Sequence, residues 1–317
     1  MRKILITGGA GFIASCLAEK LIENYENYVV IIDDLSTGDE HKLPKIKSDN
    51  WKFIKCSCND YKDIASVMTS YKFDFVFHYA AVVGVNRTQK NPVKVLQDID
   101  GIRNICSLSK NTGVKRIYYS SSSEIYGEPV EIPQHAYTTP LNSRLPYAIV
   151  KNVGEAYLRS YNKEFGLEFT IFRFFNTYGP KQSKDFVISK FINKALTGKS
   201  IGVYGDGLQT RTFCFVEDNI SACLAAFYEN KIINDVVNIG GEKEVTILEL
   251  AKIILKLTNS KSKITHLPPL QDGDMSRRCP DNTIMKEELL KRELISLEEG
   301  LKITIEKGYN LDNDDDN

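Results

Sequence analysis

The chain has 317 residues, of which 42% are hydrophobic and 26% charged, an ordinary usage for a globular protein with a buried core. Lysine plus arginine and aspartate plus glutamate are equal at 41 each, which argues against nucleic acid as a partner, since nucleic-acid-binding proteins usually carry a basic excess. No segment approaches the ~18 consecutive apolar residues of a membrane-spanning helix, so we expect no membrane partner and a cytoplasmic protein.

Short apolar strands alternate with longer helical patterns in the first part of the chain. The strands are rich in Val, Ile, Phe and Tyr with little polar alternation, which is typical of strands buried on both faces. This alternation predicts an α/β fold with a Rossmann-type, doubly wound parallel sheet. The predicted strands are 3–7, 28–33, 51–55, 73–78, 116–121 and 168–173, and the predicted helices are 12–23, 92–110 and 146–165.

The pattern changes after residue 174, where the run Asn-Thr-Tyr-Gly-Pro interrupts it. We predict a first domain over 1–174 and a smaller C-terminal α/β substrate-binding lobe over 175–310, with segments near 210–240 returning to the first domain. An acidic tail over 311–317 is expected to fray. The predicted elements of the second part are a helix near 185–196, strands at 201–204 and 210–215, and helices near 216–228, 246–256 and 297–307.

The cysteines and histidines show no metal-binding pattern. No Cys-x-x-Cys pair occurs, and the four histidines lie far apart in the sequence. We therefore expect reduced cysteines and no metal site. The cysteines are Cys16, Cys56, Cys58, Cys106, Cys214, Cys223 and Cys279.

A glycine-rich segment joins the first predicted strand to the first predicted helix. Residues 7–14 have the sequence Thr-Gly-Gly-Ala-Gly-Phe-Ile-Ala, in which Gly8 and Gly11 permit a tight turn that brings backbone amides close to a pyrophosphate. Asp33 ends the second predicted strand, and its carboxylate can accept both ribose hydroxyls while it repels the extra phosphate of NADP. The first domain is therefore predicted to bind NAD.

Tyr147 and Lys151 lie four residues apart at the start of a predicted helix, and hence on one face of it. A lysine ammonium beside a phenol lowers the pKa of the phenol, so we expect Tyr147 to act as a base near neutral pH. The strand 116–121 leads into Ser122, whose hydroxyl can orient a substrate hydroxyl against that base. A Tyr-x-x-x-Lys pair alone is a weak signal, but behind a dinucleotide-binding turn and a serine-tipped strand it indicates a reductase active site.

Further motifs follow these, namely His-Tyr-Ala-Ala at 78–81, Arg-Phe-Phe-Asn-Thr-Tyr-Gly-Pro at 173–180 and Arg-Cys-Pro-Asp at 278–281. With them the sequence resembles the extended short-chain dehydrogenase/reductase family, in particular the nucleotide-sugar epimerases, dehydratases and decarboxylases. The resemblance runs from residue 1 to about 308. It implies NAD as the cofactor, a nucleoside-diphosphate sugar as the substrate, and a homodimer.

The resemblance also implies roles for single residues. Three positions depart from the family pattern: Ala14 replaces the third glycine, Ser57 replaces an adenine-reading aspartate, and Asp98 replaces an asparagine. The implied catalytic residues are Ser122, Glu124, Tyr147 and Lys151. The implied cofactor-binding residues are Gly8, Gly11, Phe12, Ile13, Asp33, Cys58, Ala80, Tyr147 and Lys151. The implied substrate-binding residues, which would hold the substrate diphosphate, are Asn176, Arg211 and Arg278.

Three reaction outcomes stay open for such a protein. Oxidation of C4 of the sugar by NAD would acidify the C5 proton. Return of hydride to the other face then gives a 4-epimer, loss of water across C5 and C6 gives a 4-keto-6-deoxy sugar, and a C6 carboxylate leaves as carbon dioxide. Glu124 slightly favours the outcomes at C5, because simple 4-epimerases of the family usually have no acid there, whereas segment 78–87 is more similar to epimerases.

Two further expectations concern partners and activity. A catalytically silent NAD-binding sensor or scaffold is the alternative of another class, and the intact Ser122, Tyr147 and Lys151 argue against it. The helix after Pro92 and the helix that carries Tyr147 would pair in a homodimer. Apolar residues that could supply part of that face, although core packing explains them as well, are Val93, Leu96, Ile105, Val153 and Leu158.

Overall fold

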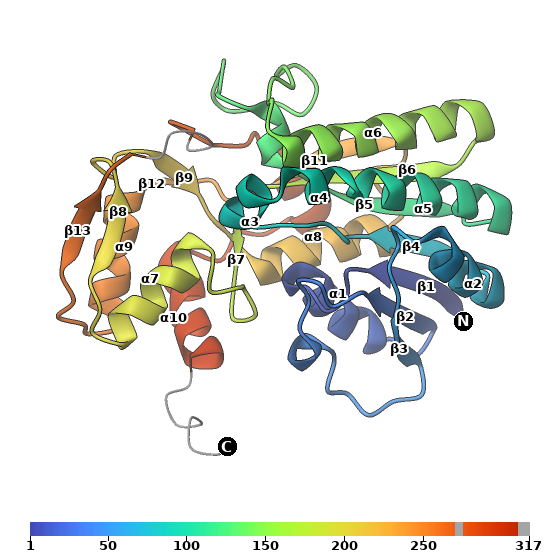
Figure 1. The fold of residues 1–317 in the computed structure, drawn as a ribbon, viewed down its shortest axis with the longest axis horizontal. Coiled ribbons are helices and arrows are strands. Elements are labelled where there is room, and N and C mark those ends of the chain that lie inside the picture. Colours follow the sequence, from blue (N-terminus) through green and yellow to red (C-terminus); the bar gives the residue numbers. More distant parts are fainter. Residues whose placement is uncertain (270–274, 310–317) are drawn as a thin grey trace.

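The computed structural model describes residues 1–269 and 275–309, and a seven-stranded parallel sheet lies at its centre (Figure 1). The strand order β11-β6-β5-β4-β1-β2-β3 shows that the chain extends the sheet on one side of β1 and then crosses to the other side at β4. The carboxyl ends of β1 and β4 therefore flank a topological switch point, where open α/β sheets bind ligands. The strands are β1 (Arg2–Thr7), β2 (Asn27–Asp33), β3 (Trp51–Lys55), β4 (Phe75–His78), β5 (Arg116–Ser122), β6 (Glu168–Phe174) and β11 (Asp235–Ile239).

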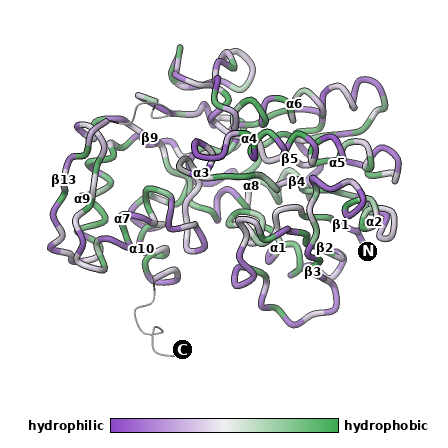
Figure 2. The backbone as a smooth tube through the Cα atoms, in the orientation of Figure 1, coloured by the Kyte–Doolittle hydropathy of each residue, from purple (hydrophilic) through white to green (hydrophobic). Residues whose placement is uncertain are grey.

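Helices cover both faces of this sheet, because the side chains of each strand point alternately to the two faces. In β1, Ile4 and Ile6 belong to the core beneath α1 and α8, whereas Leu5 belongs to the core beneath α2, α5 and α6. Hydrophilic residues gather in loops such as 34–50, at the lower edge of Figure 2. The predicted doubly wound α/β fold is confirmed. The helices are α1 (Phe12–Ile22), α2 (Tyr61–Tyr71), α5 (Asp98–Thr112), α6 (Pro146–Phe165) and α8 (Val216–Tyr228).

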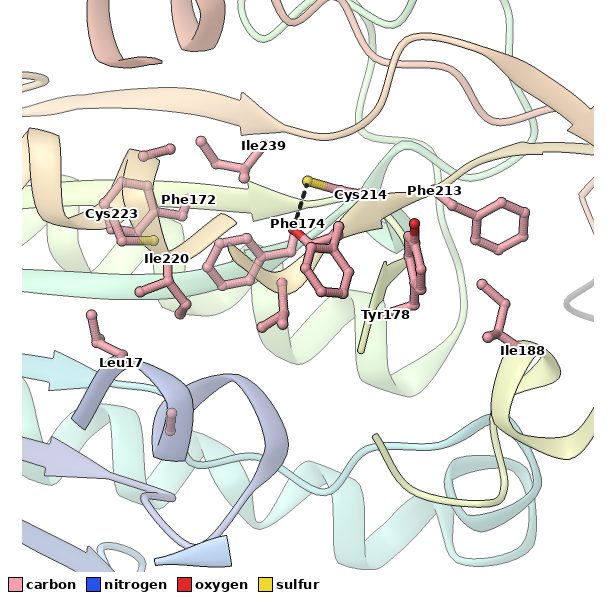
Figure 3. Packing of buried hydrophobic residues seen from close by; sticks show 14 of the residues in the cluster. Leu17, Phe172, Phe174, Tyr178, Ile188, Phe213, Cys214, Ile220, Cys223 and Ile239 are labelled. Carbon is pink, nitrogen blue, oxygen red and sulfur yellow. Dashed lines mark hydrogen bonds between the residues drawn. The ribbon is translucent and has the colours of Figure 1, made fainter. Parts of the chain in front are cut away.

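A smaller lobe lies at the left of Figure 1. In this lobe β8 pairs with β13 in parallel, and β9 pairs with β12 in an antiparallel manner. The core continues into it from the main sheet, because Leu17, Phe174, Tyr178 and Ile188 belong to one cluster of buried residues (Figure 3). The two lobes thus share a hydrophobic core. The elements are α7 (Val187–Leu196), β8 (Ile201–Tyr204), β9 (Thr210–Thr212), β12 (Glu244–Thr246), α9 (Ile247–Leu257), β13 (Ile264–Leu267) and α10 (Leu297–Gly308).

Two predicted elements are divided in the structure. The helix expected over 92–110 is two helices, α4 (Pro92–Leu96) and α5, joined by a tight turn in which the amide of Asp100 donates to the carbonyl of Gln97 at 3.0 Å. The strand expected over 210–215 is β9 followed by β10 (Cys214–Phe215), because β10 leaves β9 to pair with β7 (Thr177–Tyr178). Tertiary pairing, which local sequence does not show, causes the second division.

A helix and a strand of the first domain, α2 and β11, were not given residue ranges in the prediction. Asp60 begins α2, and its side chain accepts hydrogen bonds from the amides of Lys62 and Asp63 at 2.8 and 3.2 Å. Such a cap is a local signal that could have revealed the helix. β11 pairs with β6, from which it is distant in sequence, so only the tertiary structure shows its place. The acidic tail predicted over 311–317 lies outside the described residues.

Candidate active site

A large cleft opens at the carboxyl ends of the parallel strands, between the sheet and the smaller lobe. Its volume is about 1230 Å³, which exceeds the roughly 300–1,000 Å³ of a pocket for one drug-sized ligand. The cleft can therefore hold a dinucleotide together with a second ligand. Predicted site residues that line it are Gly8, Gly11, Phe12, Ile13, Asp33, Cys58, Ala80, Ser122, Glu124, Tyr147, Lys151, Asn176 and Arg278.

The turn after β1 is shaped for a close approach. Gly8 has a φ of +68°, and a Cβ atom there would lie 2.6 Å from the Cα atom of Ala80. The hydroxyl of Thr7 accepts hydrogen bonds from the amides of Tyr79 and Ala80, both at 3.1 Å, which hold the two segments together. Among the described residues, no side chain caps the start of α1 at Gly11. The first N–H groups of α1 are therefore available to a phosphate group, and the turn fits a dinucleotide.

Asp33 lies at the end of β2, beside this turn. Its carboxylate accepts one hydrogen bond from the amide of Ala10 at 3.0 Å and one from the amide of Leu35 at 2.8 Å. Burial raises the pKa of the carboxyl group, and the two backbone hydrogen bonds lower it. A Cβ atom at Gly38 would lie 2.6 Å from the carboxylate, so only a glycine lets the following loop pass this close. The carboxylate is thus oriented in the position expected of a ribose ligand.

Cys58, Asn59 and Asp98 form the next part of the wall. Burial raises the pKa of the Cys58 thiol, which therefore stays protonated. The carboxylate of Asp98 accepts hydrogen bonds from the amide of Val82 at 2.7 Å and from the side chain of Asn59 at 3.2 Å. Its charge also raises the pKa of Lys151. The aspartate at 98 therefore adds a negative charge near the predicted catalytic lysine.

Lys151 is anchored at the end of β5. Its Nζ atom donates to the carbonyl of Ser120 at 2.6 Å and to the Ser120 hydroxyl at 3.3 Å, a partner that the sequence did not reveal. Burial lowers the pKa of Lys151 from 10.5 to about 8, and Asp98 opposes this shift. The Nζ atom lies 5.7 Å from the centre of the Tyr147 ring. The predicted pair on α6 therefore does share one side of the cleft.

The pKa of Tyr147 differs from the expectation based on sequence. Burial raises this pKa, and the negative charge of Glu124 raises it further. A hydrogen bond with Ser122 and the positive charge of Arg278 lower it without offsetting the burial. The expectation that Lys151 brings the phenol near neutral pKa is therefore corrected, because desolvation disfavours a phenolate more than nearby charges favour it.

An ion pair connects the two lobes across the cleft. Glu124, in a short helix after β5, accepts a hydrogen bond from Nη1 of Arg278 at 2.9 Å. The arginine is only 5% exposed, and its Nε atom has no acceptor within residues 1–269 and 275–309. Both Arg278 and Tyr147 line the cleft, and the positive charge of the guanidinium lowers the pKa of the phenol. The predicted substrate-binding arginine and the predicted catalytic carboxylate are thus direct neighbours.

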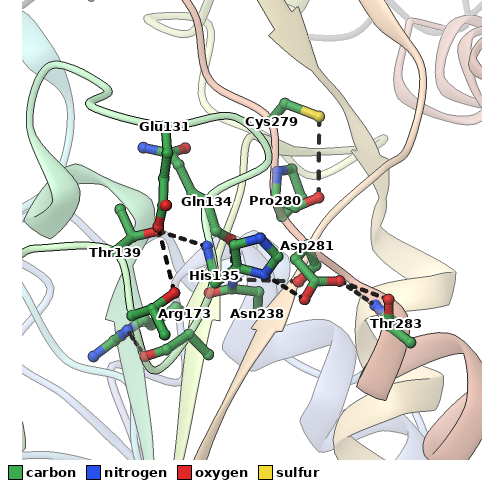
Figure 4. Close-up of polar contacts among 12 residues, drawn as sticks. Glu131, Gln134, His135, Thr139, Arg173, Asn238, Cys279, Pro280, Asp281 and Thr283 are labelled. Carbon is green, nitrogen blue, oxygen red and sulfur yellow. Dashed lines mark hydrogen bonds and ion pairs between the residues drawn. The ribbon is translucent and has the colours of Figure 1, made fainter.

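The segment that carries Arg278 is anchored to the loop before α6 (Figure 4). The amide of Gln134 donates to the carbonyl of Cys279 at 2.8 Å, and the amide of Asp281 donates to the carbonyl of Gln134 at 2.9 Å. Nδ1 of His135 lies 2.8 Å from a carboxylate oxygen of Asp281. These bonds couple the position of Arg278 to the loop that leads to the catalytic helix.

The other two predicted substrate-binding residues differ in position. Asn176 lines the cleft after β6, and its side chain donates to the carbonyl of Thr212 at 2.9 Å. Arg211, on β9, does not line the cleft; it is buried, and its Nη1 atom donates to the carbonyl of Thr210 at 2.7 Å. The structure therefore brings Asn176, but not Arg211, to the catalytic residues.

Two basic residues of the cleft were not predicted from the sequence. Lys42 and Arg87 line the cleft, although no sequence motif pointed to them.

Metal sites and membrane-spanning helices were searched for in the described residues. Residues 1–269 and 275–309 contain no cluster of three or more side chains suited to a metal ion. In the same ranges, no helix has the length and apolar character needed to cross a membrane. The cytoplasmic location stays a prediction.

A doubly wound sheet with a glycine turn, an acidic residue ending β2 and a Tyr-x-x-x-Lys pair defines a dinucleotide-dependent enzyme of the short-chain dehydrogenase/reductase class. The chain belongs to the NAD dependent epimerase/dehydratase family, whose model matches residues 4–240. The family resemblance and NAD as the cofactor are thereby confirmed.

Known proteins resemble the chain over nearly its whole length. UDP-N-acetyl-alpha-D-glucosaminuronate decarboxylase from Bacillus cytotoxicus is 37% identical, over 99% of this chain and 99% of its own. A putative UDP-glucose 4-epimerase from Methanocaldococcus jannaschii is also 37% identical, over 94% of this chain and 96% of its own. The crystal structure of UDP-glucose 4-epimerase from Thermotoga maritima, with UDP-glucose, has a TM-score of 0.89 at 34% identity, over 96% of this chain and 98% of its own.

Proposed function

We propose that this protein uses NAD to oxidise C4 of a hexose carried on a nucleoside diphosphate, and that it then acts at C5. The observation that carries this proposal is the ion pair of Glu124 with Arg278 beside Tyr147. Hydride transfer at C4 needs no carboxylate at this place, whereas proton transfer at C5 needs one. A decarboxylase and an epimerase of nucleotide sugars among the relatives support the enzyme class.

Residues of this chain prepare the step at C4. When bound, NAD supplies the hydride acceptor. Ser122 is hydrogen-bonded to Tyr147 and would hold the C4 hydroxyl against the phenol. Tyr147 would take the hydroxyl proton. Because burial disfavours its phenolate, the positive charge of Lys151, which Ser120 holds nearby, matters at the moment when this proton moves.

Among the outcomes at C5, the ion pair favours loss of carbon dioxide from a C6 carboxylate. In a 4-keto sugar this carboxylate is β to the ketone, so the C5–C6 bond can break with its electron pair delocalised into the carbonyl. A guanidinium suits the carboxylate of the substrate, and the Nε atom of Arg278 is a buried donor with no acceptor in the described ranges. Glu124, in its protonated form, would donate a proton to C5 in place of the lost carboxylate, and the hydride held by the cofactor would then return to C4 together with the proton held by Tyr147. We therefore favour a nucleotide-linked uronic acid as the substrate.

A 4-epimerase is the second candidate function. The epimerase relative from Methanocaldococcus jannaschii has the same identity to this chain as the decarboxylase from Bacillus cytotoxicus. Segment 78–87 is also more similar to epimerases. An epimerase would use Ser122, Tyr147 and Lys151 in the same way, but it would leave Glu124 without a role at C5. A silent NAD-binding sensor would need none of these four residues.

A panel of UDP-, dTDP-, GDP- and CDP-linked sugars, followed by mass spectrometry, tests the proposal. Loss of carbon dioxide from a uronic acid is the expected result. Loss of water from a neutral hexose would instead indicate a dehydratase. An unchanged mass with a new sugar configuration would indicate an epimerase, and no turnover of any sugar would support the sensor.

Two variants test the roles assigned to the ion pair. With its substrate, Glu124→Gln should accumulate NADH, visible by absorbance, while the final product fails to form. Arg278→Met should raise KM more for acidic sugars than for neutral ones, because it removes the guanidinium that would bind the carboxylate. If Glu124→Gln converts its sugar into the 4-epimer at the normal rate, the epimerase is the correct function.

We also propose a homodimer that forms through α4 and α6. Val93 and Leu96 on α4 are 71% and 41% exposed, and Ile149 on α6 is 41% exposed. Two other residues considered for this face, Ile105 and Leu158, are buried within the monomer, which is the core-packing alternative given for them. Light scattering at micromolar concentration should give twice the monomer mass, and Val93→Asp should lower it towards the monomer.

A further inference from the structure

Lys42 is a cleft residue to which neither the family resemblance nor the proposed reaction gives a role. It ends a short helical turn, Glu40–Lys42, in the loop after β2, and it lines the cleft on the side of Asp33. The side chain is half-buried. Within residues 1–269 and 275–309 its ammonium group makes no hydrogen bond and no ion pair, whereas Lys151 is bonded to Ser120.

This lysine is electrostatically unsatisfied. Burial lowers the pKa of Lys42, because its ammonium loses hydration without gaining a direct partner. The nearest negative charges, those of Asp39 and Asp33, raise this pKa without offsetting the burial. The carboxylate of Asp33 is already bonded to two backbone amides. A half-buried cation of this kind is stabilised when an anion enters the cleft beside it.

Lys181 ties the backbone of Lys42 to the first helix. The Nζ atom of Lys181 forms an ion pair with Glu19 of α1 at 2.7 Å and donates to the carbonyl of Lys42 at 3.0 Å. The segment before Lys181 packs on the start of α1, since a Cβ atom at Gly179 would lie 3.3 Å from the ring of Phe12. Lys42 is therefore held in a defined position relative to the phosphate-binding end of α1.

We propose that Lys42 binds a phosphate oxygen of the dinucleotide, and that Lys181 is the residue that positions it. The phosphates of a dinucleotide that lies between Asp33 and the start of α1 are the anions that bring negative charge to this part of the cleft. A lysine adds a point charge to the backbone amides, which bind the same group through hydrogen bonds. The inference concerns cofactor binding, so it holds whichever sugar reaction the enzyme performs.

A competition series tests the phosphate contact. Adenosine, AMP and ADP are titrated against NADH fluorescence on the wild type, Lys42→Met and Lys42→Arg. Lys42→Met should weaken the binding of AMP and ADP by about tenfold to a hundredfold, which is the effect of one hydrogen bond to a charged group. The affinity for adenosine should stay unchanged. Lys42→Arg should recover most of the affinity. Lys45→Met, in an exposed part of the same loop, is the matched control and should match the wild type.

Three outcomes would overturn the proposal. Unchanged affinity of Lys42→Met for AMP and ADP would mean that no phosphate contacts this lysine. If Lys42→Met lost as much affinity for adenosine as for ADP, the role of Lys42 would be to maintain the loop. If Lys42→Met lost affinity for 2′,5′-ADP but not for ADP, the lysine would lie at the ribose 2′ position.

The single tryptophan separates binding from loop folding. Nε1 of Trp51 donates to the carbonyl of Ile46 at 2.9 Å, so its emission reports the loop that contains Lys42. Lys42→Met should leave this emission unchanged in the absence of added nucleotide. Lys181→Met should shift the Trp51 emission and should weaken ADP binding by less than Lys42→Met does. Lys181→Arg should restore both the emission and the ADP affinity. Wild-type emission and wild-type ADP affinity in Lys181→Met would remove Lys181 from the proposal.

Discussion

The cofactor end and the sugar end of the cleft are built in different ways. At the cofactor end, backbone amides orient the functional group, as those of Ala10 and Leu35 do for Asp33. All of these residues lie in the first part of the chain. At the sugar end, side chains contact side chains, as in the pair of Glu124 with Arg278, which joins the two lobes. One end therefore depends on local backbone geometry, and the other depends on how the lobes pack.

This difference shows how one framework can support several reactions. A substitution does not remove a backbone amide, so the cofactor end tolerates changes elsewhere, whereas one substitution can remove Glu124 or Arg278. A decarboxylase and an epimerase at equal identity to this chain agree with this view. We expect changes at the sugar end to alter the reaction while NAD stays bound, and changes at the cofactor end to alter cofactor choice.

The largest effect should come from Tyr147→Phe. Loss of the phenol should lower turnover by ~10²–10⁴-fold, the usual contribution of general acid–base catalysis, while NAD affinity stays at the wild-type value. Single-turnover kinetics and calorimetry measure the two quantities. Tyr157→Phe, on the same helix but outside the cleft, is the control and should keep its activity. Equal loss of NAD binding and turnover would mean that the two ends of the cleft are not independent.

A buried ion pair beneath the cleft should have a large effect on stability. The side chains of Arg173 and Glu155 are both 3% exposed and form two hydrogen bonds with each other, at 2.7 and 2.9 Å. The hydroxyl of Ser121 also donates to the Glu155 carboxylate, at 2.6 Å. Arg173→Met leaves a buried carboxylate unpaired and should lower the free energy of unfolding by about 3–5 kcal/mol. Arg103→Met, which removes a surface pair with Asp100, should cost less than about 1 kcal/mol in the same denaturant titration. Equal costs would contradict the role of burial.

The pH dependence of stability should report Lys151, which is predicted to serve both the cofactor and the catalytic tyrosine. Burial lowers its pKa from 10.5 to about 8, so between these values the unfolded chain binds the proton and the folded protein does not. The contribution of Lys151 to the free energy of unfolding should therefore rise with pH from about 8 to 10.5, by on the order of 3 kcal/mol. In denaturant titrations, the stability of the wild type relative to Lys151→Met should increase by this amount over the range, since other titrating groups affect both proteins alike. Parallel curves would mean that the lysine keeps its ordinary pKa.

The smallest effect concerns cofactor choice. The wild type should bind NAD more tightly than NADP, because the carboxylate of Asp33 repels the extra phosphate. Asp33→Asn keeps an acceptor for the backbone amides but removes the charge, so the preference should fall by about tenfold. Calorimetry with both cofactors measures it, with Asp49→Asn in the same loop as control. Equal affinities in the wild type would show that Asp33 does not select the cofactor.

Sequence signals were sufficient where the structure depends on neighbours in the chain. Residues 7–14 and Asp33 lie at the ends of short buried strands, and the apolar composition of these strands, together with the helices that alternate with them, indicates a parallel sheet. The same reasoning missed β11, which is distant in sequence from its partner β6, and joined α4 to α5 across a tight turn. Arg211 is not among the residues that line the cleft, and its role towards the substrate stays a prediction.

The sequence by itself determined the fold class, the dinucleotide turn and the shared face of Tyr147 and Lys151. These features follow from helix and strand periods, which act over a few residues. Only the tertiary structure decided that Glu124 pairs with Arg278, that burial keeps the pKa of Tyr147 high, and that Lys42 lines the cleft without a partner in the described ranges. The reason is that ion pairing and desolvation depend on distance and burial in space, and the packing of the two lobes sets both.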